Sequence, residues 1–209
     1  MTRTDSFSMK KILLTCFEPF GGETINPSAE AMKNVIPPFG CELIKLQLPV
    51  LWEGAEKLLF DAIDDFSPDS VLMTGQAGGT SAIRIERVAI NLCGAIKDEA
   101  GLYPGGSARP TELPAREGAP AAYFSTYDAR KILDALKKEN IPAGYSYSAG
   151  TYICNYIMFS ALDRLASTES DVPAGFIHLP YADGQKSGSP SMGIDMMSRA
   201  IEIILAQMI

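Results

Sequence analysis

Short apolar segments alternate with amphipathic ones along most of this sequence, and that rhythm limits the fold more than any other feature. The run at residues 12–17 has the composition of a buried strand, and Asn26 followed by Pro27 is typical of a helix start. A first helix that uses Ile36 in its apolar face is expected to end at Pro37. The strongest amphipathic helix is predicted at residues 52–66.

The same alternation continues to the end of the chain. Further strands are predicted at residues 43–48, 70–74, 83–92, 144–148 and 174–179, and further helices at 126–138, capped by Thr126, at 154–165, and from Ser189 and Pro190 to 208. Strands that alternate with helices favour a parallel sheet covered on both faces. We therefore expect an α/β protein, a three-layer α/β/α sandwich with an open, largely parallel twisted sheet.

The length of the chain indicates the number of domains, and its composition excludes some classes of binding partner. At 209 residues a single domain over 1–209 is the simplest arrangement, with residues 1–8 as a disordered extension and Met1 or Met9 as the start. A formal charge of −7 argues against nucleic acid or an anionic membrane as a partner. No apolar stretch approaches the roughly 18 residues of a membrane span.

The cysteines and the histidine bear on metal binding and compartment. The four cysteines, at 16, 41, 93 and 154, form no CxxC pair, and the chain has one histidine, so no metal site is expected. Unpaired cysteines without a secretory leader favour a cytoplasmic protein.

The turn at residues 146–156 places Cys154 at the start of a helix. An apolar stripe follows the cysteine at helical spacing: Met158, Ala161, Leu162 and Leu165. Free N–H groups and the positive dipole end at such a position favour a thiolate and can stabilise an oxyanion. The setting suits a nucleophile, but a cysteine that only fills the core explains the local sequence equally well.

A nucleophilic thiol needs a base, and His178 is the one histidine in the chain. It lies near the end of a short apolar run that Pro180 stops, at the strand end where parallel sheets place their sites; the alternative is a core histidine with one backbone hydrogen bond. On a regular strand over residues 83–92, Glu86 shares a face with Val88 and points inward. Its partner could be His178, or a structural Arg84 or Arg87, and spacing alone leaves both open.

Two glycine-rich segments complete the pattern. The stretch from Gly75 to Gly79 lacks the lysine and the spacing of a phosphate-binding loop, so a tight turn beside a small ligand is the better interpretation, and a flavodoxin-like nucleotide binder is disfavoured. Residues 93–120 are rich in Gly and Pro and predict a long surface loop or lid, with room for a short hairpin.

Three sequence blocks, taken together, resemble the pyroglutamyl peptidase I family of cysteine peptidases. The blocks are Phe17-Glu18-Pro19-Phe20-Gly21-Gly22 with Asn26-Pro27-Ser28, Gly75-Gln76-Ala77-Gly78-Gly79 with Glu86-Arg87-Val88-Ala89-Ile90-Asn91, and Ser148-Ala149-Gly150-Thr151-Tyr152-Ile153-Cys154-Asn155 with Gly175-Phe176-Ile177-His178-Leu179-Pro180. The resemblance covers nearly the whole chain. It implies a cytoplasmic α/β/α enzyme, commonly a homotetramer, that removes an N-terminal pyroglutamyl residue from peptides without a cofactor.

The resemblance also implies roles for individual residues. Cys154 matches the nucleophile, His178 the base, and Glu86 the carboxylate that orients the histidine. The pyroglutamyl pocket would be formed by a set of five matching positions: Phe17, Phe20, Asn26, Gln76 and Tyr152, the last standing where the family usually has Phe. Aromatic walls suit the methylenes of a lactam ring, whose N–H and C=O each need a polar partner.

Several positions depart from the family pattern. Cys16 replaces a Gly, Glu18 replaces an Asp, the family's Ala-Arg-Ile-Pro-Asp stretch is here residues 95–99 with Ile96 and Lys97, and the loop at 97–118 is longer. An alternative function follows from the missing Arg: a binding or scaffold protein of the same fold with little turnover. The retention of Cys154, His178 and Glu86 favours the enzyme.

Overall fold

The computed structural model describes residues 9–209 and has a central sheet of six strands in the order β2-β1-β3-β8-β4-β7. The strands are β1 (Lys10–Phe17), β2 (Cys41–Leu48), β3 (Ser70–Gln76), β4 (Ile83–Glu86), β7 (Ala143–Ser146) and β8 (Ala174–Leu179). All neighbouring pairs are parallel except β4 and β8, which are antiparallel. The largely parallel sheet predicted from the sequence is therefore confirmed, with a reversal of chain direction at β4.

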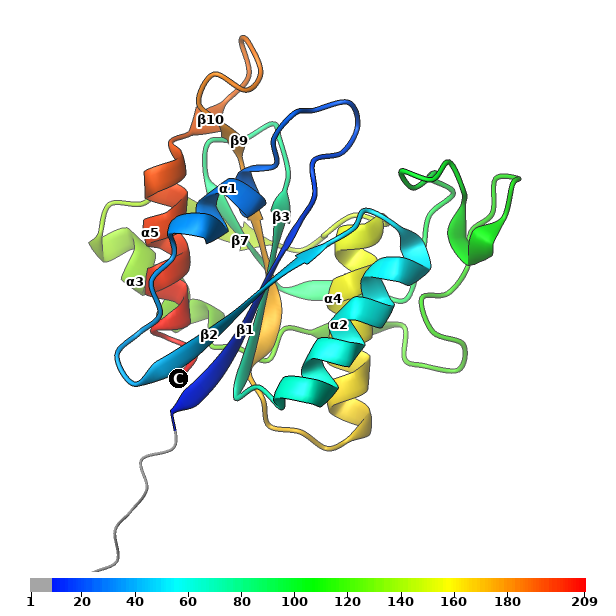
Figure 1. Ribbon diagram of the computed structural model, residues 1–209, viewed down its shortest axis with the longest axis horizontal. Helices are drawn as coiled ribbons and strands as arrows, with labels where there is room; N and C mark the ends of the chain where they lie inside the picture. Colours follow the sequence, from blue (N-terminus) through cyan, green and yellow to red (C-terminus); the bar gives the residue numbers. More distant parts are fainter. Residues whose placement is uncertain (1–8) are drawn as a thin grey trace, which may run out of the picture.

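Helices cover both faces of the sheet, as Figure 1 shows. The helices are α1 (Pro27–Asn34), α2 (Trp52–Phe66), α3 (Ala129–Lys138), α4 (Ile153–Ser167) and α5 (Ile194–Leu205). Helices α1, α3 and α5 pack together on one face, and α2 packs beside α4 on the other. The predicted three-layer sandwich is confirmed.

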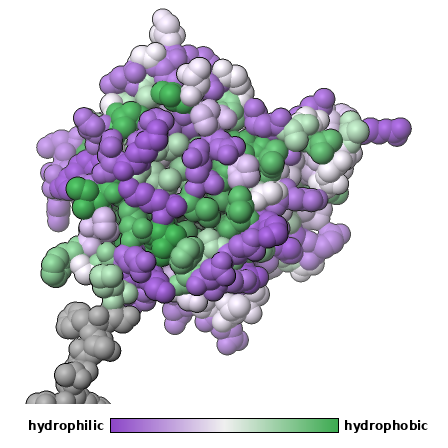
Figure 2. All heavy atoms as spheres, viewed as in Figure 1, coloured by the Kyte–Doolittle hydropathy of each residue, from purple (hydrophilic) through white to green (hydrophobic). Residues whose placement is uncertain are grey.

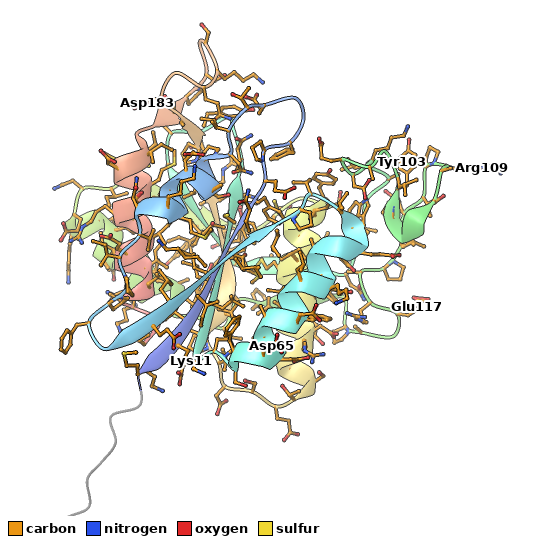
Figure 3. The ribbon with its side chains drawn as sticks, in the orientation of Figure 1. Lys11, Asp65, Tyr103, Arg109, Glu117 and Asp183 are labelled. Atoms are coloured by element: carbon orange, nitrogen blue, oxygen red, sulfur yellow. The ribbon has the colours of Figure 1, made fainter. Side chains whose placement is uncertain are left out.

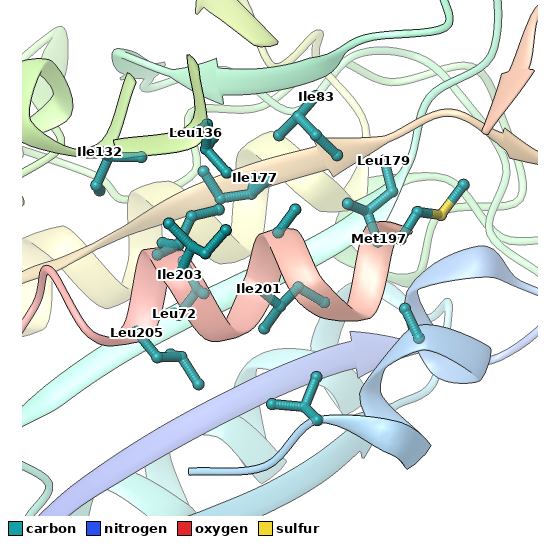
Figure 4. Close-up of a cluster of buried hydrophobic side chains, with 14 of the residues drawn as sticks. Leu72, Ile83, Ile132, Leu136, Ile177, Leu179, Met197, Ile201, Ile203 and Leu205 are labelled. Carbon is teal, nitrogen blue, oxygen red and sulfur yellow. The ribbon is translucent and has the colours of Figure 1, made fainter. Parts of the chain in front are cut away.

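Each face of the sheet has its own apolar core. On one face, Ile201 and Met197 of α5 pack with Leu72 of β3 and Ile177 of β8, as Figure 4 shows. On the other face, Leu59 of α2 and Ile157 of α4 pack against the sheet in a second cluster, which also contains Leu13, Met73 and Phe176. Burying each such side chain contributes about 1.5–3 kcal/mol, so the two cores fix the sheet between its helices.

The prediction of one continuous strand over residues 83–92 is wrong. This segment is broken at Arg87 into β4 and β5 (Val88–Ile90), and β5 pairs in a separate small sheet with β6 (Ala122–Phe124), a strand that the sequence did not reveal. The inward face of Glu86 is therefore not set by Val88, which is only half-buried. Glu86 is buried because β4 lies between β8 and β7 inside the main sheet.

Three predicted helix limits are also corrected. Helix α1 ends at Asn34, and Ile36 is 70% exposed beyond it. Helix α3 begins later than predicted, because Asp128 rather than Thr126 accepts hydrogen bonds from the first-turn N–H groups. Helix α5 begins after Gly193, because Ser191–Met192 forms strand β10, which pairs with β9 (Tyr181–Ala182).

The predicted long loop is present between β5 and β6. It contains a 3₁₀ turn, η1 (Pro104–Gly106), and two isolated antiparallel bridges, Cys93 with Leu113 and Tyr103 with Ser107. Figure 3 labels Tyr103, Arg109 and Glu117 in this loop, which projects beside α2.

The predicted N-terminal extension, residues 1–8, lies outside the described residues. Within residues 9–209, none of the helices is both long and apolar enough to cross a membrane. Figure 2 shows polar side chains interspersed with apolar ones over the face turned to the viewer. Apolar side chains that stand out into solvent include Phe39, Phe124 and Tyr147.

Tyr127 fastens two strands that meet beneath the site. Its buried hydroxyl lies 2.7 Å from the carbonyl oxygen of Glu86 and 3.0 Å from the carbonyl oxygen of Phe176. It can donate a hydrogen bond to either oxygen. Gly175 makes room for the ring, since a Cβ there would lie 2.2 Å from a ring carbon of Tyr127. The hydroxyl thus ties β4 to β8 on the face opposite the thiol.

We expect Tyr127→Phe to lower the free energy of unfolding by about 1–2 kcal/mol, because the buried hydroxyl that donates to the carbonyl oxygens of Glu86 and Phe176 is lost. Urea unfolding measures this change. Tyr147→Phe, at a side chain that is 70% exposed, is the matched control and should leave stability unchanged. Equal midpoints for the Tyr127 variant and the unmodified protein would contradict the role.

Candidate active site

The site lies at the edge of the sheet where β1, β3 and β8 end. These three strands are parallel, so the loops that follow them leave from the same edge. The β1 loop (residues 18–26) and the β9 loop (residues 183–190) both rise above this edge in Figure 1. Figure 3 labels Asp183 in the β9 loop and Lys11 at the opposite edge.

Cys154 stands in the first turn of α4. The chain turns into the helix through Gly150, whose φ of 81° belongs to the left-handed region that glycine tolerates, and Tyr152 is the N-cap in an extended conformation. In the part of the chain that the structure describes, no side chain caps this end of the helix. The first-turn N–H groups are therefore available to a ligand beside the thiol, as expected for a helix N-terminus.

His178 and Glu86 form a buried pair beneath this turn. Nδ1 of His178 lies 2.8 Å from Oε1 of Glu86, and the side chains are 6% and 0% exposed. Arg84 is paired in register with His178 across the antiparallel strands, so Glu86, two residues further along β4, lies one step deeper on the same face. The reversed direction of β4 is thus what buries the carboxylate below the imidazole.

Gly75 brings the thiol to the histidine. It is in register with His178 on the neighbouring strand, and a Cβ built on it would lie 3.2 Å from Sγ of Cys154 and 2.9 Å from the ring of Phe176. The sulfur therefore sits directly over the backbone of β3, beside the imidazole. The sequence predicted a tight turn beside a small ligand from Gly75 onward, whereas Gly75 lies within β3 and makes room for the thiol.

The electrostatics of His178 follow from these neighbours. Burial alone would lower its pKa, but the charge of Cys154, a side-chain hydrogen bond with that sulfur, and the Glu86 carboxylate together raise it to about 9. The folded-state pKa is above the ordinary 6.5, so the stabilisation from a charged imidazole is complete below about pH 6.5 and is lost as the pH rises through about 9.

The other two buried cysteines differ from Cys154. Burial raises the pKa of Cys16 to about 12 and that of Cys93 to about 12. Both are therefore held as neutral thiols in the apolar clusters. The core-filling interpretation applies to them, whereas Cys154 is half-buried and faces His178.

The partner of Glu86, left open by the sequence, is His178. Within residues 9–209 its carboxylate pairs with no arginine. Arg84 instead donates to the carbonyl oxygen of Gly78, and Arg87 lies over the ring of Tyr145. Oε2 of Glu86 has no hydrogen-bond partner among the described residues, so His178, at Oε1, is the one side chain there that pairs with this carboxylate.

Aromatic side chains gather on the thiol face of the sheet. Phe17, at the end of β1, has its ring centroid 6.4 Å from that of Phe176, and Phe20 packs against the same cluster. Tyr152 stacks edge-on against Trp52 at 5.5 Å and donates to the carbonyl oxygen of Lys97. Three of the five predicted pocket residues thus lie on the side of the sheet that carries Cys154.

The remaining two predicted pocket residues are engaged elsewhere. Asn26 is 1% exposed; its Oδ1 accepts from Ser28 as the cap of α1, and its Nδ2 donates to the carbonyl oxygen of Glu18. It shapes the β1 loop. Since Gly75 faces the thiol, the side chain of Gln76 leaves β3 on the opposite face, where Oε1 accepts from Gln185 at 2.8 Å.

The stretch at residues 95–99, which departs from the family pattern, is firmly attached. Nε1 of Trp52 donates to the carbonyl oxygen of Ile96, and the carboxylate of Asp98 accepts from the backbone N–H of Trp52 at the start of α2. Glu99 accepts from the N–H of Gly21 at 3.1 Å. The segment therefore joins α2 and the β1 loop to Tyr152.

Sequence reasoning missed residues that hold this site. Tyr127 and Gln185 have no local signature, because their partners are 41 and 109 residues away. Asn155 is buried, accepts from the N–H of Ile90 and donates to the carbonyl oxygens of Ile90 and Leu92. A polar residue in the apolar first turn of α4 was a signal that could have found Asn155.

We expect Glu86→Gln to lower the pKa of His178 below about 9 by about one pH unit or more, because the carboxylate charge is removed while a hydrogen-bond acceptor remains. The chain's one histidine gives an unambiguous imidazole signal for NMR titration. Glu42→Gln, on the edge strand β2, is the control. An unchanged titration in the Glu86 variant would show that the carboxylate does not act on the imidazole.

Known proteins resemble this chain along almost its whole length. Pyrrolidone-carboxylate peptidase 1 of Caldanaerobacter subterraneus subsp. tengcongensis is 42% identical over 196 residues, which cover 92% of this chain and 94% of that protein. The pyrrolidone-carboxylate peptidase of Thermococcus kodakarensis is 42% identical over 198 residues, or 93% of this chain and 94% of that protein.

Solved structures agree with these sequences. The crystal structure of pyroglutamyl peptidase I from Bacillus amyloliquefaciens has a TM-score of 0.87 and 38% identity, covering 95% of this chain and 94% of that one. A variant of the pyrrolidone carboxyl peptidase of Pyrococcus furiosus has a TM-score of 0.86 and 36% identity over 95% and 97% of the two chains. The pyroglutamyl peptidase family itself matches residues 10–209. With a buried histidine–carboxylate pair beside a helix-terminal thiol, and with this match over nearly all of the described chain, the protein belongs to the pyroglutamyl peptidase family.

Proposed function

We propose that this protein is a cysteine exopeptidase that hydrolyses the amide bond after an N-terminal pyroglutamyl residue, and that Cys154, His178 and Glu86 are its catalytic triad. The observation that carries the assignment is the buried 2.8 Å pair of His178 and Glu86 next to the Cys154 thiol. A buried histidine and carboxylate beside a thiol supply the nucleophile, base and orienting group that acyl transfer requires.

The proposed reaction begins with the proton of Cys154 on the imidazole of His178. Sγ attacks the pyroglutamyl carbonyl carbon, and the electron pair of the C=O bond moves to oxygen, where first-turn N–H groups of α4 stabilise the oxyanion. The intermediate collapses to a thioester as the C–N bond breaks, and the imidazolium gives its proton to the departing amine. Water then attacks the thioester while His178 accepts its proton; the C–S bond breaks, the pyroglutamyl group is released as the free acid, and the Cys154 thiolate beside protonated His178 is restored.

Glu86 acts through the histidine in this scheme. Its Oε1 accepts from Nδ1, so the other ring nitrogen, Nε2, is the one left to serve the sulfur and the leaving amine. The carboxylate also stabilises the imidazolium, in agreement with the raised pKa of His178. A buried charge without such a partner would be costly, so neither the carboxylate nor the imidazolium is stable here without the other.

We further propose that Phe17, Phe20 and Tyr152 form the apolar walls around the lactam methylenes. Their position on the thiol face supports this assignment. Asn26 contributes by shaping the β1 loop, and Gln76 by holding the end of β3 next to Gly75. The tight attachment of residues 95–99 speaks against the alternative of a decayed, binding-only protein, because that segment still supports Tyr152.

A cytoplasmic location and a homotetramer remain parts of the proposal. Four cysteines that are all free support a reducing compartment. Exposed apolar side chains such as Phe39 and Phe124 support contact with further copies of the chain. Sedimentation analysis of the purified protein tests the assembly.

Cys154→Ala should abolish hydrolysis of a fluorogenic pyroglutamyl amide while leaving the fold intact, because the acyl-enzyme route disappears and only a small side chain is lost. Steady-state kinetics and circular dichroism measure both effects. Iodoacetamide should inactivate the unmodified protein through this thiol. Cys41→Ala, on β2, is the control and should keep its activity and remain sensitive to the alkylator; near-normal activity in the Cys154 variant would refute the nucleophile.

Pyroglutamyl amides should be hydrolysed far faster than prolyl or glutaminyl amides. The prolyl ring has no lactam carbonyl and carries a positive charge at neutral pH, so it places a cation between the apolar walls. We expect kcat/KM for the prolyl amide to be lower by about 10⁴ or more. Side-by-side assays decide this, and comparable rates on the prolyl amide would show that the pocket does not recognise the lactam.

A further inference from the structure

Gln185 lies in the β9 loop, away from the triad, yet its side chain joins three separate parts of the chain. Its Nε2 lies 2.8 Å from Oε1 of Gln76 at the end of β3, and 3.4 Å from both Oε2 of Glu23 and the carbonyl oxygen of Ile25 in the β1 loop. Its Oε1 accepts from the backbone N–H of Ala182 at 3.0 Å. All of these contacts are at least partly buried, so water competes with them only weakly.

The orientation of both amides is determined by the backbone. The N–H of Ala182 can only donate, so the Gln185 atom that faces it must be the oxygen. The amide nitrogen of Gln185 then points to Gln76 and the β1 loop, where Ile25 offers a carbonyl oxygen that can only accept. Gln76 must in turn present its own oxygen to Gln185. A carboxylate at position 185 cannot replace this arrangement, because it has no hydrogen to donate.

The segments that Gln185 joins are the ones that shape the pocket. Gln76 follows Gly75, over which the thiol of Cys154 sits. Glu23 closes the turn that carries Phe20, because the N–H of Glu23 donates to the carbonyl oxygen of Phe20. Between them lie Gly21 and Gly22, with φ of 63° and 81°. A turn built on two glycines has no stiffness of its own, so its position depends on contacts from outside.

We propose that Gln185 is a positioning residue for substrate recognition: it holds the β1 loop, and with it Phe20, against the end of β3. The inference rests on the proposed pyroglutamyl peptidase function and deepens it. Gln185 contributes to binding of the lactam ring and leaves the chemistry at Cys154 unaffected. Loss of a contact that serves the bound substrate and the transition state equally raises KM without changing kcat.

The experiment compares Gln185→Met, Gln185→Glu and the double variant Glu23→Gln with Gln185→Glu, using a fluorogenic pyroglutamyl amide. Gln185→Met removes the hydrogen bonds at similar volume, and we expect KM to rise about tenfold with kcat within about twofold of normal. Gln185→Glu should raise KM further, because its carboxylate faces Glu23. In the double variant, the amide introduced by Glu23→Gln can donate to the carboxylate introduced by Gln185→Glu. The amide of Gln76 can turn to donate to that carboxylate as well. KM should therefore fall back towards normal.

Two further measurements separate positioning from a general structural role. The rate at which iodoacetamide alkylates Cys154 should stay the same in all of these variants, because a small reagent does not need the pocket. Ser187→Ala, on an exposed neighbour in the same loop, is the matched control and should leave KM unchanged.

The inference would be overturned by a KM for Gln185→Met within about twofold of normal, or by kcat and the alkylation rate falling together. Failure of the double variant to recover would also overturn it, since the exchange of donor and acceptor would then have no effect. An unmodified protein that does not hydrolyse the pyroglutamyl amide would instead refute the proposed function, and with it this inference.

Discussion

The buried contact between His178 and Glu86 is the interaction on which the rest of the site depends. A buried carboxylate is costly without a partner, and the imidazole of His178, whose pKa is raised to about 9, supplies one. The pair requires β4 to run antiparallel to β8, because this direction carries Glu86 below His178 rather than out to the rim of the sheet. The one irregularity in an otherwise parallel sheet therefore coincides with the proposed chemistry.

Around this pair, the strands form a rigid base, and the loops above it are held in place by contacts from other segments. Gly75 lets the thiol rest on β3, and Tyr127 locks β4 to β8 from the other side. The β1 loop has little internal structure and is held by side chains from distant segments, Glu99 on one side and Gln185 on the other. The sheet therefore holds the thiol, imidazole and carboxylate, while the position of the β1 loop depends on contacts from distant residues.

The stretch at residues 95–99 illustrates this division. It differs from the family pattern, yet its backbone and side chains still anchor Trp52, Tyr152 and Gly21. Its contacts are mostly to backbone groups, and these constrain side-chain identity less than they constrain chain direction. The loop can therefore keep its structural role although Ile96 and Lys97 stand where the family has other residues.

The sequence by itself determined the layered α/β fold and indicated Cys154 and His178 as a candidate nucleophile and base. Alternating apolar and amphipathic segments predict strands and helices because burial follows the period of each element, and a helix-terminal Cys154 with a single histidine at a strand end indicates a nucleophile and its base. Only the tertiary structure decided that Glu86 pairs with His178 rather than with Arg84 or Arg87, that the strand breaks at Arg87, and that the side chain of Gln76 turns away from the thiol towards Gln185. Strand direction and register, and contacts between residues far apart in the chain, settle those points, and no local pattern contains them.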